Sequence, residues 1–175
     1  MTFVPFVGTL AYLFDRQAEQ VLLIRRDARP DDDHFGKVNG LGGKLEIGEH
    51  IYDGLRREIN EEAGVEIVSP SLRGTIAWTD FGPKREQWLG FIFLIDEWEG
   101  NFRTENEEGS LEWVSLTRLL NACHHDELIR AEANLPIWEG DRHFIPLIFD
   151  DDPRCFHGAM PYDGNDFKGW SYERH

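Results

Sequence analysis

The sequence predicts an α+β fold in which a mixed β-sheet is flanked by helices, an α/β/α sandwich. Strand-like and helix-like segments alternate along the chain without the regular rhythm of a βαβ protein. The 175 residues match the usual size of one domain, and no repeat or long Gly/Ser linker divides them. We therefore expect residues 1–175 to form a single domain.

The predicted strands are short runs rich in β-branched and aromatic residues, bounded by turn residues. In order along the chain, these runs are Val4–Phe14, Val21–Arg26, Val65–Val68, Leu72–Thr79, Gln87–Ile95 and Leu111–Val114. The last part of the chain has the pattern of a hairpin, with Cys155–Tyr162 and Phe167–Tyr172 as its strands. Asp163-Gly164-Asn165 supplies the turn between them.

Three segments have helical patterns. The longest runs from about Glu49 to Ala63 and stops at Gly64, the residue type that favours a left-handed helix end. Shorter helices are expected near Leu116–Asn121 and Glu127–Ala133. The segment Asp27–Lys37 contains Pro30 and three successive aspartates, and is predicted to be a loop.

Composition and charge exclude several functional classes. The chain has 18 Lys and Arg against 33 Asp and Glu, a formal charge of −15. Binding to a nucleic-acid backbone rests on clustered Lys and Arg, so no nucleic-acid polymer is expected as a partner. No apolar run approaches the roughly 20 residues that span a bilayer, and Met1–Pro5 has no features of a signal peptide. Cys123 and Cys155 are expected to be reduced, as in a cytoplasmic protein.

The predicted helix Glu49–Ala63 carries an unusual set of carboxylates. Its residues Tyr52, Leu55, Ile59 and Ala63 share one apolar stripe, which we expect to be buried. Glu58, Glu61 and Glu62 lie on a neighbouring arc, where their like charges weaken an isolated helix. A bound Mg²⁺ or Mn²⁺ among the glutamates would relieve that repulsion, because hard cations prefer oxygen ligands. The alternative is a solvated acidic face paired with neighbouring arginines.

The spacing around these glutamates resembles the signature of the Nudix hydrolases. The matching positions are Gly43, Glu49, Arg57, Glu58, Ile59, Glu61, Glu62, Gly64 and Val65. The resemblance implies the Nudix fold and the hydrolysis of a nucleoside diphosphate linked to another moiety. The cofactor it implies is Mg²⁺, with Mn²⁺ as a substitute.

The resemblance also implies a role for each signature residue. Glu58 and Glu62 would ligate the metal directly, and Glu61 would ligate it or orient a metal-bound water. Glu49, expected in the first turn of the helix, would pair with Arg57, which orients the ligating glutamates. Gly43 lets the backbone turn tightly, and its carbonyl would join the metal shell.

A further acidic residue, Glu108, is a candidate metal ligand or base. It lies in the acidic, exposed connection Glu97–Gly109, five residues before Trp113. Many family members place an additional catalytic glutamate at the entrance to the corresponding strand. Glu105 and Glu107 compete for this role.

Other segments resemble the MutT-type branch, whose members hydrolyse oxidised purine nucleoside triphosphates. Asn39-Gly40-Leu41-Gly42-Gly43-Lys44 matches its N-G-x-G-G-K segment, and Trp138 and Asp141 match its Trp-x-x-Asp segment. The resemblance implies that Trp138 stacks on the base while Asn39 and Asp141 read its edge. Vertebrate members have two adjacent aspartates, whereas this chain has Gly140 at the first position. Thr9 and Phe35 are additional candidates for the base pocket.

Few basic residues are available for the phosphates. Arg25 and Lys44 are the candidates, with Arg26 and Lys37 close by in sequence. The favoured substrate is 8-oxo-dGTP or a related oxidised purine nucleotide, with other dNTPs, nucleotide sugars and ADP-ribose as alternatives. A catalytically silent Nudix module that senses a nucleotide is a further alternative. We expect a monomer or a homodimer, with a small nucleotide as partner and no membrane contact.

Overall fold

The fold is built around one strongly curled mixed sheet. A computed structural model describes all residues 1–175. The long central strands are β1 (Phe6–Asp15), β5 (Pro70–Phe81) and β6 (Glu86–Ile95). The order in the sheet is β10-β9-β5-β6-β1-β2-β3, with β8 paired to β2 and β11 paired to β9. Two pairs, β1–β6 and β5–β9, are parallel and the others are antiparallel, as expected for a mixed sheet.

The remaining strands are short. Their bounds are β2 Gln20–Arg25, β3 Val38–Asn39, β4 Glu66–Ile67, β7 Trp98–Glu99, β8 Ser110–Ser115, β9 Phe156–Gly164, β10 Asp166–Phe167 and β11 Ser171–Arg174. Strands β4 and β7 form a separate two-stranded sheet. The predicted C-terminal hairpin is present: β9 turns into β10, and β11 resumes antiparallel pairing with β9.

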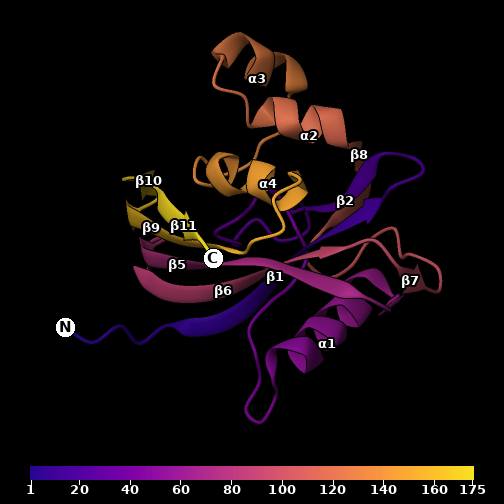
Figure 1. The fold of residues 1–175 in the computed structure, drawn as a ribbon, viewed down its shortest axis with the longest axis horizontal. Helices are drawn as coiled ribbons and strands as arrows, with labels where there is room; N and C mark the ends of the chain where they lie inside the picture. Colours follow the sequence, from indigo (N-terminus) through magenta and orange to yellow (C-terminus); the bar gives the residue numbers. More distant parts are fainter.

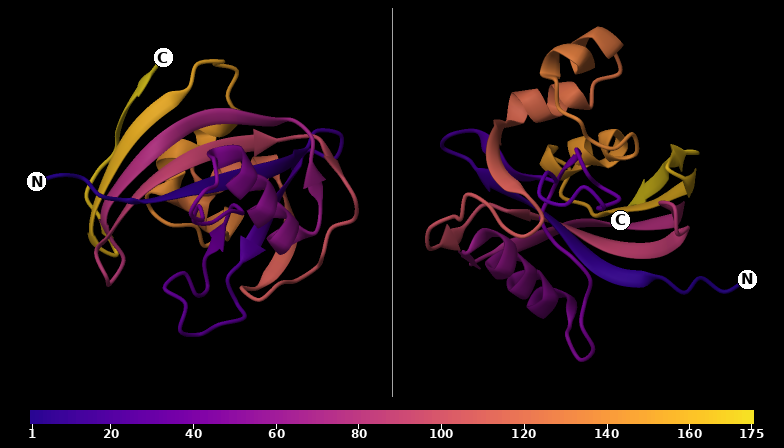
Figure 2. Two further views of the ribbon diagram at one scale, coloured as in Figure 1. Left: turned by 90° about the horizontal axis from the view of Figure 1, so that it is seen from below. Right: turned by 180° about the vertical axis from the view of Figure 1, so that it is seen from behind.

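Helices cover both faces of the sheet, which confirms the predicted layers. Helix α1 (Ile51–Ala63) lies on one face, and α2 (Leu116–Ala122), α3 (Glu127–Ala133) and α4 (Asp141–Phe149) lie on the other (Figure 1). Figure 2 shows how the curled sheet separates α1 from the other three helices. None of the four helices is long and apolar enough to cross a membrane.

Each face of the sheet has its own apolar core. On one side, Leu55, Ile59 and Ala63 of α1 are fully buried against β1 and β6, as the predicted stripe requires. On the other side, Phe144 and Ile148 of α4 join α2 and the opposite face of the sheet. Because both faces of the sheet are packed against helices, the strand ends from which the loops emerge are held in place.

Helix α4 is not predicted from the sequence. Pro146 lies inside it and removes one backbone donor, so the sequence of this segment does not indicate a helix. The buried stripe of Phe144, Ile145 and Ile148 stabilises the helix in the folded protein. Its apolar contacts with the sheet therefore outweigh the unfavourable proline.

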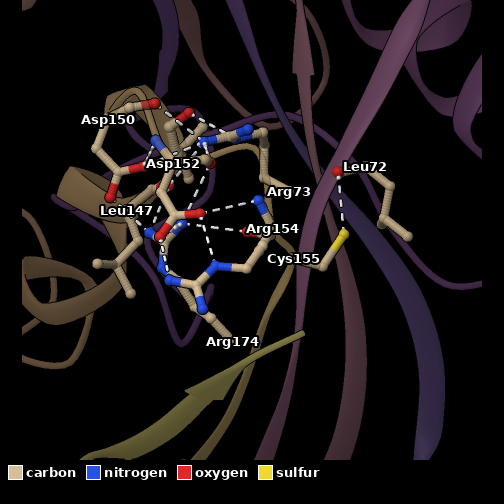
Figure 3. Close-up of polar contacts among 9 residues, drawn as sticks. Leu72, Arg73, Leu147, Asp150, Asp152, Arg154, Cys155 and Arg174 are labelled. Carbon is tan, nitrogen blue, oxygen red and sulfur yellow. Dashed lines mark hydrogen bonds and ion pairs between the residues drawn. The ribbon is translucent and has the colours of Figure 1, made fainter.

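Two arginines fix the C-terminal end of α4 to the sheet. Arg73 of β5 donates to the carbonyls of Ile148 at 2.9 Å and of Asp150 at 3.1 Å. Arg174 of β11 pairs with Asp150 at 2.5 Å and with Asp152 at 3.6 Å (Figure 3). Helix carbonyls without intrahelical partners need such donors. The arginines thus hold α4 in place, and with it Asp141 at its other end.

Candidate active site

The glycine-rich segment lies between β1 and the carboxylates of α1. The carbonyl of Gly43 accepts from the Thr9 amide at 2.9 Å, so this segment runs beside β1. A Cβ atom on Gly43 would lie 2.6 Å from the carboxylate of Glu58, and one on Gly42 would lie 2.1 Å from the Thr9 carbonyl oxygen. Gly42 also has a φ of 141°. Only glycine fits beside the strand at Gly42, and a side chain at Gly43 would displace the Glu58 carboxylate.

Arg57 contacts the carboxylate of Glu49, just before α1, and two carboxylates within the helix. Its guanidinium binds both oxygens of Glu49, at 2.7 and 3.0 Å, and donates to Glu58 at 2.8 Å. It also contacts Glu61 at 3.4 Å and the Lys44 carbonyl at 3.0 Å. The hydrogen bonds from Arg57 lower the pKa of Glu49 to about 2.

Glu49 itself lies outside α1, which begins at Ile51 after the N-cap His50. The prediction that Glu49 occupies the first helical turn is therefore wrong. Its carboxylate instead accepts from the Glu46 amide at 2.8 Å and closes a short loop before the helix. The pairing with Arg57, in contrast, is present in the structure.

Glu58, Glu62 and Glu108 form a cluster of interacting negative charges. Glu62 is only 8% exposed, and its carboxylate accepts from the Gly42 amide at 2.8 Å. Burial, and next the charge of Glu108, raise the pKa of Glu62 to about 8. Burial also raises the pKa of Glu58, with smaller contributions from Glu61 and Glu108 that oppose the effect of Arg57. Glu108 pairs with Arg26.

This donor set fits a hard divalent cation. No three Asp, Glu, His or Cys side chains meet in a closed metal shell, and two of the carboxylates, Glu58 and Glu108, are paired with Arg57 and Arg26. However, the carboxylates raise one another's pKa, which is the repulsion that a cation relieves. The Gly43 carbonyl keeps a second lone pair beyond its bond with Thr9. Oxygen donors of this kind suit Mg²⁺ or Mn²⁺.

One pocket is lined by two chemically different groups of residues. Glu58, Glu108 and Gly43 belong to the first group, which we call the carboxylate end, and Asn39, Trp138 and Asp141 belong to the second, which we call the aromatic end. Lys44 also lines the pocket, with its ammonium group 3.8 Å from the centre of the Phe6 ring and 4.9 Å from that of Trp88. The arrangement can hold an elongated anionic molecule with an aromatic part.

Polar atoms without partners mark the aromatic end of the pocket. The Thr9 hydroxyl and the Asn39 side-chain oxygen are buried and have no hydrogen-bond partner in the protein. Such groups are costly unless a bound molecule or water satisfies them. Burial raises the pKa of Asp141 to about 7, so near neutral pH part of the population has a carboxyl group that donates a hydrogen bond.

The segment that carries Trp138 is tied to β3. The amide of Val38 donates to the Pro136 carbonyl at 3.0 Å, which brings Trp138 beside Asn39. Gly140 packs closely against Met160 and the Tyr162 hydroxyl, at 2.3 and 2.5 Å from where its Cβ would be. A side chain at Gly140 would therefore displace the ends of the Met160 and Tyr162 side chains.

Two predicted substrate-binding residues lie outside the pocket. Arg25 is at the end of β2 and pairs with Glu112 of β8 at 2.7 Å. Phe35 is 48% exposed and does not line the pocket. Their sequence neighbours Arg26 and His34 line it instead, so the structure does not support the predictions for Arg25 and Phe35.

Four aromatic or histidine side chains contact one another at the aromatic end of the pocket, although the sequence singled out only Trp138. Phe81 packs edge-on against Trp138 at 5.3 Å and against Tyr162 at 4.9 Å. His34 packs against Phe81 at 5.7 Å and Trp138 at 5.6 Å. These residues come from four separate segments, and no periodic pattern connects them in the sequence. Their aromatic character was the only available signal.

Comparison with known proteins agrees with this geometry. Residues 4–135 match the family model of the NUDIX domain. The uncharacterized Nudix hydrolase YvcI of Bacillus subtilis is 32% identical over 146 residues, which cover 82% of this chain and 80% of that protein. The oxidized purine nucleoside triphosphate hydrolase of Mus musculus is 31% identical over 122 residues, 70% of this chain and 69% of that protein.

A solved structure shares nearly the whole fold. The MutT protein from Bacillus halodurans has a TM-score of 0.76 and 25% identity, over 96% of this chain and 97% of that chain. Both the match to the domain and the similarity of the fold include the glycine-rich segment and the carboxylates of α1. The chain therefore belongs to the Nudix hydrolase family.

Proposed function

We propose that this Nudix hydrolase is a divalent-metal-dependent pyrophosphohydrolase of nucleoside triphosphates. Its substrate would be 8-oxo-dGTP or a related oxidised purine nucleotide, hydrolysed with one water to the monophosphate and pyrophosphate. The observation that carries the proposal is the single pocket with two different ends. Carboxylates line one end, and an indole, an amide and a carboxyl group line the other.

At the carboxylate end, the side chains of α1 would hold the metal and the phosphates. Glu58 and Glu62, with Glu61, Glu108 and the Gly43 carbonyl, are the proposed ligands. A bound divalent cation lowers the pKa of water and neutralises phosphate oxygens. Arg57 fixes the orientation of Glu58 and, through Glu49, the loop before the helix. Lys44 lies where it can bind a phosphate oxygen.

At the aromatic end, the proposed contacts suit a purine. The Trp138 ring offers a surface for stacking, which sequence-tolerant nucleotide sites commonly use. The Asn39 amide has both a donor and an acceptor, and its oxygen is unpartnered. Protonated Asp141 adds a donor, and the Thr9 hydroxyl adds a second adaptable group. A family relative in mouse is named for hydrolysis of oxidized purine nucleoside triphosphates, which supports this choice of base.

The test is a panel of substrates assayed with Mg²⁺. We would compare 8-oxo-dGTP, dGTP, ADP-ribose and a dinucleoside polyphosphate, following pyrophosphate and monophosphate release. The expected result is preferential hydrolysis of 8-oxo-dGTP, which stops on chelation and returns with Mg²⁺ or Mn²⁺. Equal or faster hydrolysis of another compound would reject the proposed base, and no turnover of any compound would favour a silent nucleotide-sensing module.

Two further predictions accompany the proposed function. A cytoplasmic location stays a prediction from the cysteine content. A monomeric or homodimeric state also stays a prediction, which sedimentation velocity would check.

A further inference from the structure

His34 occupies a position in the pocket that the proposed reaction does not explain. It lies in the loop between β2 and β3 and lines the aromatic end of the pocket. Its ring nitrogen Nδ1 is 2.9 Å from the indole nitrogen Nε1 of Trp138. The Nδ2 of Asn39 lies 3.5 Å from the same Nδ1 atom. His34 therefore touches both of the residues proposed to recognise the base.

The contact with Trp138 determines where the proton of His34 resides. An indole N–H only donates, so Nδ1 of His34 must be the acceptor and the single proton of the neutral ring lies on Nε2. A charged imidazolium would place a second donor against the indole N–H. Burial, and next the charge of Arg26, lower the pKa of His34, so the neutral ring prevails at neutral pH.

The loop around His34 is itself fixed by ion pairs. Asp32 accepts from the His34 amide at 3.0 Å and pairs with Arg26 at 2.6 Å. Arg26 in turn pairs with Glu108 at the carboxylate end of the pocket. A continuous chain of polar contacts thus runs from the carboxylate end to the indole of Trp138.

We propose that His34, as the neutral Nε2–H tautomer, is a positioning residue that fixes the plane of the Trp138 indole for base stacking. The inference rests on the proposed function, because it assigns a purpose to the stacking surface of that same pocket. No other protein group accepts from the Trp138 indole. Without His34, the contacts with Phe81 and with the Lys37 ammonium, 4.9 Å from the ring centre, would not fix the direction of the indole edge.

Two substitutions separate the hydrogen bond from the shape of the ring. His34→Phe keeps a flat ring but has no acceptor, whereas His34→Asn loses the ring but keeps an acceptor close to the position of Nδ1. His125→Asn, at an exposed histidine between α2 and α3, is the matched control. Circular dichroism and thermal unfolding would verify that each variant is folded.

The first measurement uses the protein without any nucleotide. In a ¹H–¹⁵N spectrum, the Nε1–H resonance of Trp138 is identified by its loss in Trp138→Phe. We expect this resonance to move upfield in His34→Phe and to stay close to its original position in His34→Asn. The ¹⁵N shifts of the His34 ring should show the proton on Nε2. A proton on Nδ1, or an unchanged indole resonance in His34→Phe, would overturn the proposal.

The second measurement is kinetic. With 8-oxo-dGTP, His34→Phe should raise KM about five- to tenfold, the value of one neutral hydrogen bond, and change kcat by less than about twofold. His34→Asn should recover most of that loss. In the background of Trp138→Phe, which stacks but has no N–H, His34→Phe should add nothing further. Additive effects, or a larger defect in His34→Asn than in His34→Phe, would contradict the proposal.

The two measurements separate the inference from the proposed function. If 8-oxo-dGTP is not hydrolysed, the proposed function fails, while the spectra still decide whether His34 orients Trp138. If 8-oxo-dGTP is hydrolysed and the His34 variants behave like the control, the inference fails and the proposed function stands.

Discussion

We expect Asp141, which lines the pocket, to lower the free energy of unfolding at alkaline pH, because its buried carboxyl group must then ionise. It is the first residue of α4, and burial raises the pKa of its carboxyl group to about 7. The unfolded chain would have the ordinary value of 3.8. The folded protein therefore holds this proton more tightly than the unfolded chain does. Its contribution to stability is fully present below pH 3.8 and is lost as pH rises to about 7.

The size of this loss follows from the two pKa values. Raising a pKa from 3.8 to about 7 corresponds to about 4 kcal/mol of unfavourable free energy once the carboxylate is ionised. Asp141→Asn removes that charge in a side chain of nearly the same shape. The variant also loses the attraction between an anion and a helix N-terminus, worth about 0.3–1 kcal/mol. The net gain at pH 8.5 should be about 3 kcal/mol, or about 6–12 °C in Tm for a chain of this size.

The measurement is the difference in Tm between Asp141→Asn and the unchanged protein from pH 5 to pH 8.5. Because all other titrating groups are shared, the difference isolates residue 141. At pH 5 the unfolded carboxyl group is already ionised while the folded one is not, so we expect a difference equivalent to about 1–2 kcal/mol there, which grows until about pH 7. Asp166→Asn, an exposed aspartate in the β9–β10 hairpin, should leave Tm unchanged at each pH. A difference that is equal at both ends of the pH range would refute the reasoning.

Three other predictions concern catalysis, base binding and stability. Glu58→Gln and Glu62→Gln should each lower kcat at least about a hundredfold with an unchanged circular dichroism spectrum, because each removes a proposed metal ligand; near-normal rates would reject that role. Trp138→Ala should raise KM for 8-oxo-dGTP about 5- to 150-fold with a smaller change in kcat, as expected for a lost stacking surface. Arg73→Ala should lower the free energy of unfolding by about 1–3 kcal/mol in urea titrations, because it leaves the carbonyls of Ile148 and Asp152 without their partly buried charged donor. Arg85→Ala, at a 60% exposed ion pair, should cost less than about 1 kcal/mol.

Much of the fold follows from local patterns in the sequence. The apolar stripe of α1 and its glycine end predict a helix, and Gly64 does adopt the left-handed conformation with a φ of 78°. The helix Glu127–Ala133 is predicted with its observed bounds. Helix α4 could not be predicted in the same way, because Pro146 opposes it locally. The contacts that stabilise it come from β5 and β11, which are distant in sequence.

The candidate site likewise has one part that local sequence patterns predict and one part that they do not. The signature residues lie on a helix and a tight glycine segment, where spacing fixes geometry, so their proximity is predictable. The loop between β2 and β3 has no such regularity. The candidates Arg25, at the end of β2, and Phe35, in this loop, do not line the pocket, whereas their neighbours Arg26 and His34 do. Successive side chains at the end of a strand point to opposite faces of the sheet, which separates Arg25 from Arg26.

The formal charge of the chain is −15, and the way the site carboxylates are paired with arginines affects whether a polyphosphate could bind near them. Arg57 contacts Glu49, Glu58 and Glu61, and Arg26 pairs with Glu108. Glu62 alone has no guanidinium partner and relies on a backbone amide, and it is also the most buried of the site carboxylates. A cation placed among the carboxylates would therefore gain most at Glu62, which has no guanidinium in direct contact with it. Such a cation also brings the positive charge that a triphosphate needs, so a strongly acidic protein and a polyanionic substrate are compatible at this one place.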